Sequence, residues 1–179
     1  MVVALFQKLA IPGIAAAAAA VTAAIGGSEG SAPAYDAPAT RIEALSLAQS
    51  AASQFDRADL NNDLQLDADE YAMLAVVTSE LARLNGFVAV ISAAGAQPVA
   101  LAEGQGAPLS VAERAEVRAR ALKDYEGVAG RDGRITRDEF VGAQLEQLFL
   151  NDADRDGALT GAELARFTAH ASRLPTRES

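Results

Sequence analysis

The spacing of hydrophobic residues along the chain predicts a mainly α-helical protein. In four segments apolar side chains recur every three or four positions, which is the period of a helix with one buried face. A fifth helix is predicted from residue 110 by the capping box Ser110-x-x-Glu113. The expected buried stripes are Ile42, Leu45, Ala48, Ala52 and Phe55; Tyr71, Leu74, Val77, Leu81 and Leu84; Val141, Leu145 and Leu148; and Leu164, Phe167, Ala171 and Leu174.

The ends of several helices can also be predicted. Thr40 is expected to be the N-cap of the first helix, which should end just before Asp59. Asn85-Gly86 should stop the second helix, because both residue types are common at helix C-termini.

The pattern changes between residues 87 and 101, where we expect an inserted β-hairpin. Phe87–Ile91 is β-branched and aromatic, Gly95 and Pro98 are turn signals, and Val99–Leu101 would be the second strand. The hairpin could be a docking edge for a partner or a lid on the core. The lid is favoured, because two-stranded hairpins are rarely stable alone.

Two acidic stretches interrupt the helical pattern, and residues 152–163 are the clearer one. Three carboxylates alternate with other residues at positions 1, 3 and 5, and a glycine follows at position 6, where it permits a sharp turn. Position 8 is apolar and position 12 is a glutamate. The predicted oxygen donors are Asp152, Asp154, Asp156, the backbone carbonyl of Ala158, Thr160 and Glu163.

Residues 59–70 repeat this arrangement with one departure. Leu64 occupies position 6, where a branched residue in the left-handed region costs roughly 1–2 kcal/mol. This departure weakens the expected affinity and leaves the donor set intact. The predicted donors here are Asp59, Asn61, Asp63, the carbonyl of Gln65, Asp67 and Glu70.

Both stretches match D-x-[DN]-x-[DN]-G-x5-E, apart from Leu64, and the chain therefore resembles the EF-hand superfamily of calcium-binding proteins. The resemblance covers most of residues 40–174. It implies helix–loop–helix units that bind Ca²⁺, a hard ion that takes six to eight oxygen ligands.

A third loop, residues 128–139, is degenerate. Asp132, Gly133, Ile135 and Glu139 fit positions 5, 6, 8 and 12, but Val128 and Gly130 offer no side-chain oxygen at positions 1 and 3. An offset loop that uses Glu126 or backbone carbonyls is the alternative. We expect this loop to bind calcium weakly or not at all, while Thr136-x-x-Glu139 caps the following helix.

The sequence does not determine which loops pair with each other. Only 12 residues separate Glu139 from Asp152, and one helix of that length would hold the two loops roughly 18 Å apart. The two loops are therefore not expected to pair with each other. Either of them could pair with loop 59–70.

The N-terminal residues differ in composition from the rest. Residues 1–24 are interpreted as a signal peptide, or as an uncleaved anchor, because an uncharged, alanine-rich run follows Lys8. Residues 25–38 resemble a flexible linker, residues 39–175 form the EF-hand domain, and 176–179 are a tail. The protein is expected to be exported, periplasmic or secreted, and to contact a membrane only if the N-terminal segment is retained.

Composition narrows the function further. The chain has a net charge of -9, no cysteine and a single histidine, His170. These features argue against nucleic-acid binding, disulfides, cysteine-ligated zinc and thiol catalysis, and nothing indicates an enzyme. The preferred function is structural calcium binding in an exported protein that docks an unidentified partner. The alternative is a calcium sensor that exposes an apolar surface, although Met1 and Met73 are few methionines for such a groove.

Overall fold

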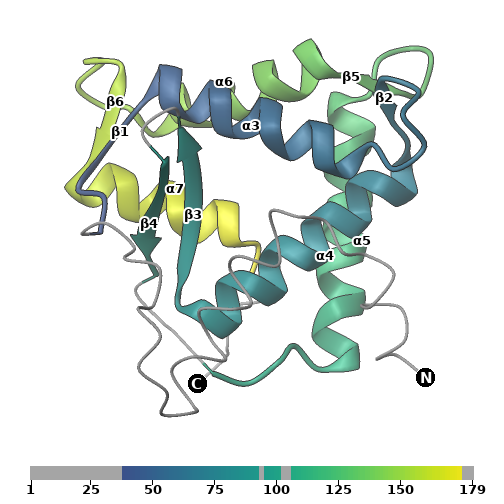
Figure 1. The fold of residues 1–179 in the computed structure, drawn as a ribbon, viewed down its shortest axis with the longest axis horizontal. Helices are drawn as coiled ribbons and strands as arrows, with labels where there is room; N and C mark the ends of the chain where they lie inside the picture. The colour runs from purple at the N-terminus through teal and green to yellow at the C-terminus, as the bar shows by residue number, and fades with distance from the viewer. Residues whose placement is uncertain (1–37, 93–94, 102–105, 175–179) are drawn as a thin grey trace. The chain divides into compact units, whose positions relative to one another are not determined.

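The computed structural model describes residues 38–92, 95–101 and 106–174, which all lie within the compact region Asp36–Ser179. The predicted signal peptide, nearly all of the predicted linker and the tail lie outside the described residues. Along the chain (Figure 1) the elements are β1 (Arg41–Glu43), α3 (Ala44–Ala58), β2 (Gln65–Leu66), α4 (Ala68–Asn85), β3 (Phe87–Ser92), β4 (Gly95–Ala100), α5 (Val111–Val128), β5 (Ile135–Thr136), α6 (Arg137–Asn151), β6 (Ala158–Thr160) and α7 (Gly161–Ser172).

The described part of the chain is mainly helical with small antiparallel sheets, as predicted. Helix α3 ends at Ala58, directly before Asp59, and Gly86 closes α4 in the left-handed region at φ 72°. The capping boxes that open at Ser110 and Thr136 are both present, with the side chain and backbone of each pair bonded reciprocally. Local sequence therefore sets most of the helix boundaries.

The start of α3 was predicted wrongly. Thr40 is not its N-cap, because residues 41–43 form strand β1 and the helix begins at Ala44 after Glu43. The strand exists because it pairs with β6, which lies more than 100 residues further along the chain. This pairing overrides the local capping signal.

The buried stripes were predicted only in part. Ile42 and Phe55 are buried as predicted, but Leu45 is exposed, and α3 also buries Leu47, Ser50, Ala51 and Ala58. On α4, Tyr71 is buried as expected. Small residues such as Ala72, Ala75 and Ala82 take the most buried positions, while Leu74, Val77, Leu81 and Leu84 are half-buried. Alanine at these positions lets neighbouring elements approach the helix closely.

The hairpin is present and acts as a lid on the core, but its second strand begins earlier than predicted, so that Gly95 and Pro98 lie within β4 and not in a turn. Strands β3 and β4 pair antiparallel, with Phe87 opposite Ala100 and Val90 opposite Gln97. Val90 and Val99 are both buried, in a cluster that also contains Phe167 of α7. The hairpin is therefore stabilised by the helices that it covers.

Two units of similar construction follow one another in the chain. The first consists of β1, α3, loop 59–70 and α4, and the second of β5, α6, loop 152–163 and α7. A constant shift of 93 positions relates them, as from Asp59 to Asp152 and from Glu70 to Glu163. Helices α3 and α6 each have 15 residues, so the distance from leading strand to loop is the same in both units.

The two units pair crosswise. The leading strand of the first unit pairs with the loop strand of the second, which places Ile42 opposite Leu159. The leading strand of the second unit pairs with the loop strand of the first, which places Leu66 opposite Ile135. This reciprocal pattern is that of a two-fold, self-complementary interface within one chain. Figure 1 shows α3 beside α6, with one small sheet at each end of the pair.

This arrangement answers the question of which loops pair. Loop 59–70 pairs with the degenerate loop 128–139 through β2 and β5. Loop 152–163 pairs with β1, a strand that belongs to no loop recognised in the sequence. As expected, the degenerate loop and loop 152–163 do not pair with each other.

Each small sheet lies in its own hydrophobic cluster. Leu66 and Ile135 are fully buried among residues of α3, α4, α5 and α6, including Phe55 and Phe140. Ile42 and Leu159 are buried with Leu148 and residues of the hairpin and α7. The paired apolar side chains at loop position 8 thus anchor both loops to the core.

Tyr125 of α5 ties the first loop pair together. Its hydroxyl lies within hydrogen-bonding distance of the carbonyl oxygens of Gly133 and Leu66, one from each loop, the latter at 3.3 Å. Its ring packs on Tyr71 with the centroids 5.7 Å apart. Burial raises the pKa of the Tyr125 phenol above its ordinary value.

We expect Tyr125→Phe to lower the free energy of unfolding by about 1 kcal/mol at neutral pH, the net value of one such hydrogen bond. Because the folded protein favours the neutral phenol, this stabilisation is present below about pH 10 and is lost as pH rises through the raised pKa. Urea denaturation at neutral and alkaline pH measures both effects. Equal stability of the two proteins at neutral pH would contradict the assignment.

Candidate metal centre

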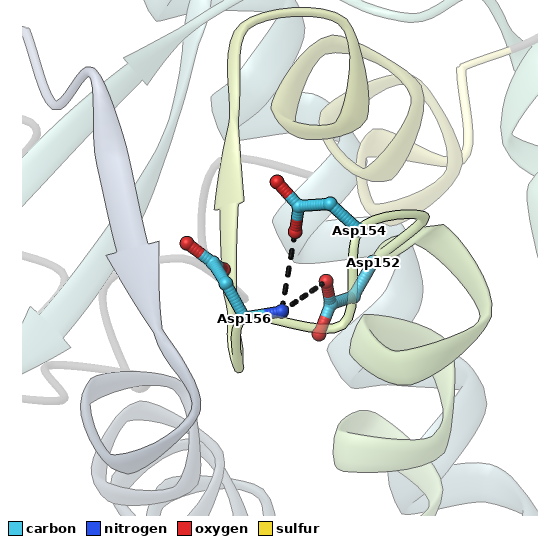
Figure 2. A group of neighbouring side chains, drawn as sticks. All are labelled: Asp152, Asp154 and Asp156. Carbon is cyan, nitrogen blue, oxygen red and sulfur yellow. Dashed lines mark hydrogen bonds between the residues drawn. The ribbon is translucent and has the colours of Figure 1, made fainter.

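Loop 152–163 brings together three of the carboxylates predicted as ligands. Asp152 follows the last residue of α6, and the loop then turns back into β6 and α7. One oxygen from each of Asp152, Asp154 and Asp156 lies within 4.8 Å of the others. Figure 2 shows the backbone N–H of Asp156 between the side chains of the other two. The backbone curls between positions 1 and 5, and this curl brings the three aspartate side chains together.

Backbone N–H groups hold this curl. The N–H groups of positions 5 and 6 donate to the two oxygens of position 1, and position 5 also donates to position 3, while position 7 donates to position 5. The distances are 3.2 Å for Asp156 to Asp152 Oδ1, 3.0 Å for Gly157 to Asp152 Oδ2, 3.1 Å for Asp156 to Asp154 Oδ1 and 2.9 Å for Ala158 to Asp156 Oδ1. Each carboxylate is thus oriented by the backbone, as hydrogen bonds to a charged acceptor are comparatively strong.

Loop 59–70 contains the same bonds at the same positions, although its sequence differs. The distances are 3.1 Å for Asp63 to Asp59 Oδ1, 3.0 Å for Leu64 to Asp59 Oδ2, 2.8 Å for Asp63 to Asn61 Oδ1 and 3.0 Å for Gln65 to Asp63 Oδ1. The oxygens of positions 1, 3 and 5 therefore accept equivalent backbone hydrogen bonds in both loops.

The glutamate at position 12 closes each loop in the same way. Glu163 accepts the N–H of Ala153 at 2.8 Å on one oxygen and the N–H of Thr160 at 3.3 Å on the other. Glu70 accepts the N–H groups of Leu60 and Asp67, both at 3.0 Å. In both loops one carboxylate oxygen accepts the N–H of position 2 and the other accepts the N–H of position 9. The glutamate therefore connects the beginning of the loop to its end.

The backbone dihedral angles are shared as well. Position 4 is left-handed in both loops, with φ 58° at Asn62 and 61° at Arg155. Position 6 is left-handed too, with φ 67° at Leu64 and 79° at Gly157. Leu64 adopts the conformation that its place in the pattern predicted, despite the steric cost, and its side chain is 75% exposed.

Three of these carboxylates are buried without a basic partner. Asp59, Asp152 and Glu70 are each only 7% exposed, and in the part of the chain that the structure describes none forms an ion pair with lysine or arginine. Burying charge is costly unless it is compensated, and here only N–H dipoles compensate it. A bound cation would compensate this charge.

The remaining predicted ligands are placed on or beside strands. Gln65 lies in β2 and Ala158 in β6, at the positions expected to offer carbonyl oxygens. Thr160 ends β6. Asp67 has a second task, because its Oδ1 caps α4 by accepting the N–H groups of Asp69 and Glu70, both at 2.9 Å.

The degenerate loop has the turn but not the cluster. Gly133 is left-handed at φ 67°, as position 6 is in the other loops, whereas Arg131 at position 4 is not. The Asp132 and Glu139 carboxylates both lie against Gly130, where an added Cβ would be 3.4 Å from an oxygen of each. With no oxygen-bearing side chain at positions 1 and 3, two carboxylates remain.

Two arginines that the sequence reading did not single out contact the loops from the opposite unit. Arg41 of β1 donates to Asp156 Oδ2 at 2.9 Å, and Arg134, beside β5, has its Nη1 3.6 Å from Asp63 Oδ2. The Arg41 hydrogen bond, helped by the N–H of Ala158, holds the pKa of Asp156 below its usual value. The sequence does contain a signal for these arginines. The pairs Arg41-Ile42 and Arg134-Ile135 are separated by the same 93 positions as the two acidic loops.

Arginines of helix α5 also contact an acidic loop and a neighbouring helix. Arg118 donates to Asp69 at 2.6 Å, while Arg114 forms a bidentate pair with Glu80 of α4. Helix α5 therefore contacts loop 59–70 through Arg118 and helix α4 through Arg114.

Comparison with protein families, with curated proteins and with solved structures finds no match for this chain. Within the described residues, no helix has the length and hydropathy needed to cross a membrane.

We expect Leu64→Gly to stabilise the calcium-free protein by roughly 0.5 to 1 kcal/mol, because glycine relieves the strain of the left-handed conformation while the exposed leucine contributes little packing. Gly157→Ala at the equivalent position should cost about 1 kcal/mol, since an added Cβ meets no atom within 4 Å there and only the dihedral strain remains. Urea denaturation with a chelator present measures both. The same sign for both variants would contradict the equivalence of the loops.

Proposed function

We propose that the protein binds two calcium ions through EF-hand loops at residues 59–70 and 152–163. The ligands of the first are Asp59, Asn61, Asp63, the Gln65 carbonyl, Asp67 directly or through water, and Glu70. Those of the second are Asp152, Asp154, Asp156, the Ala158 carbonyl, Thr160 directly or through water, and Glu163.

The observation that carries this proposal is the repetition of one hydrogen-bond scheme in two loops of different sequence. A solvent-exposed acidic turn has no reason to reproduce bonds from positions 2, 5, 6, 7 and 9 together with left-handed residues at positions 4 and 6. In loop 152–163 the scheme goes with one oxygen from each of positions 1, 3 and 5 lying within 4.8 Å of the others. Such a set suits a hard cation.

The chemistry of the donors favours calcium over other metals. All are oxygens, and the two loops contain no histidine or cysteine that would select zinc or copper. Mg²⁺ demands small octahedral geometry and keeps several waters, whereas Ca²⁺ accepts seven or so irregularly placed ligands, including a bidentate glutamate.

The proposed role of the metal is to stabilise the domain. In its absence several carboxylates repel one another within each loop. Calcium removes this repulsion, and its binding free energy is added to the stability of the fold. Because each loop strand pairs with a strand of the other unit, the ions would fasten the two units together. We further propose that the protein is exported, to a compartment where millimolar calcium fills sites of 10⁻⁴–10⁻³ M affinity.

Isothermal titration calorimetry should find two calcium ions per chain. Glu70→Gln and Glu163→Gln should each weaken one site by at least about tenfold, because each removes a charged bidentate ligand. The matched control is Glu139→Gln in the degenerate loop, which should leave both sites unchanged. Equal losses from Glu139→Gln and Glu163→Gln would show that the degenerate loop is a third site, and no binding to the unaltered chain would overturn the proposal.

A stabilising role and a sensing role predict different responses to calcium. At about 10 mM calcium, sites of 10⁻⁴–10⁻³ M affinity should each add roughly 1.4 to 2.7 kcal/mol to the free energy of unfolding. For a stabilising role we expect this increase with little change in binding of a hydrophobic dye. A strong gain in dye fluorescence on calcium addition would instead support the sensor, as calcium opens an apolar groove in such proteins.

A further inference from the structure

We propose that Arg41 and Arg134 lower the calcium affinity of the two loops, each acting on the loop of the opposite unit. The inference rests on the proposed calcium sites. It concerns residues outside both ligand sets, and it assigns to each site one cation that competes with the metal.

Arg41 occupies the oxygen of Asp156 that the loop itself leaves free. Asp156 Oδ1 accepts the N–H of Ala158, while Oδ2 accepts Nη1 of Arg41 at 2.9 Å. Asp156 is the ligand at position 5, so the guanidinium already satisfies part of the negative charge that would attract calcium. Glu43, 3.7 Å from Arg41 Nε, holds the arginine from the same strand.

Arg134 has the same relation to the other loop. Asp63 Oδ1 accepts the N–H of Gln65, and Oδ2 lies 3.6 Å from Arg134 Nη1. The same Nη1 is 3.9 Å from Asp67 Oδ2. It is buried and has no hydrogen-bond partner among the described residues, so its nearest compensation is the charge of these two carboxylates.

The two arginines are equivalent by the internal repeat. Arg134 lies 93 positions after Arg41, and Asp156 lies 93 positions after Asp63. The crosswise pairing of strands therefore delivers one arginine to position 5 of each loop. Surface ion pairs that arise by chance have no reason to follow this two-fold relation.

The physical consequence is a penalty on metal binding. A calcium ion at either loop would lie within several ångströms of a guanidinium, and the two like-signed charges would repel. For one double and one single charge about 6 Å apart in water this repulsion corresponds to about a tenfold change in affinity. Arg41 should have the larger effect, because it also hydrogen-bonds a ligand oxygen directly.

Calcium titration of single-site variants tests the proposal, with calcium chloride as the only ligand. Glu70→Gln weakens the site at 59–70, so that calcium binding reports mainly on the site at 152–163. Glu163→Gln does the reverse. Adding Arg41→Gln should tighten calcium binding about tenfold in the first background and leave it unchanged in the second. Adding Arg134→Gln should tighten binding in the second background only, by a smaller factor.

Two controls separate this effect from general electrostatics and from misfolding. Arg120→Gln removes the same charge from an exposed position on α5, paired within its own helix with Glu116, and should change neither site. Arg41→Lys keeps the positive charge, so the calcium affinity of loop 152–163 should stay close to that of the unaltered protein. If Arg41→Gln fails to fold, as judged by circular dichroism, Arg134→Gln tests the proposal on the other loop.

The outcomes distinguish the two proposals. If the single-site variants bind no calcium, the proposed function fails. If they bind calcium and the arginine variants change nothing, or weaken binding, or act on both sites alike, the inference about the arginines is overturned while the calcium sites stand.

Discussion

Repulsion between crowded carboxylates is the constraint on which this structure depends. In loop 152–163 one oxygen from each of three aspartates lies within 4.8 Å of the others, and in both acidic loops the position-1 aspartate is buried. Backbone N–H groups orient these oxygens, but a dipole offsets a buried charge only in part. The rest of the fold must therefore hold the loops closed against their own charge.

The crosswise pairing of the two units provides that restraint. Leu66 and Ile135 are buried opposite each other at one end of the α3–α6 pair, and Ile42 and Leu159 at the other. Burying such a side chain contributes roughly 1.5 to 3 kcal/mol, several times the value of an exposed ion pair. Each loop is thus anchored at position 8 by the apolar side chain of a strand from the other unit.

The sequence predicted features that depend on residues close together in the chain. It failed to predict features that depend on residues far apart in the chain. The backbone hydrogen bonds of the loops, the left-handed positions and the capping boxes depend on residues fewer than 12 positions apart, so Leu64, Gly86 and Ser110 could be interpreted one at a time. The hairpin is local as well. The predicted N-cap at Thr40 was wrong because β1 forms only against β6, and Leu45 was misplaced because the packing of α3 against α6 decides which face is buried. Loop pairing is non-local for the same reason.

The arginines show what such non-local placement adds to a local motif. Arg41 is 115 residues from Asp156, and within the motif itself nothing refers to it. The motif specifies oxygens that attract a cation, whereas the paired strand determines how much positive charge is already beside them. Under the proposed function, two loops with similar ligands would differ in calcium affinity, since Arg41 hydrogen-bonds directly to its aspartate and Arg134 only approaches its own. Affinity would then depend on the strand pairing as well as on the loop.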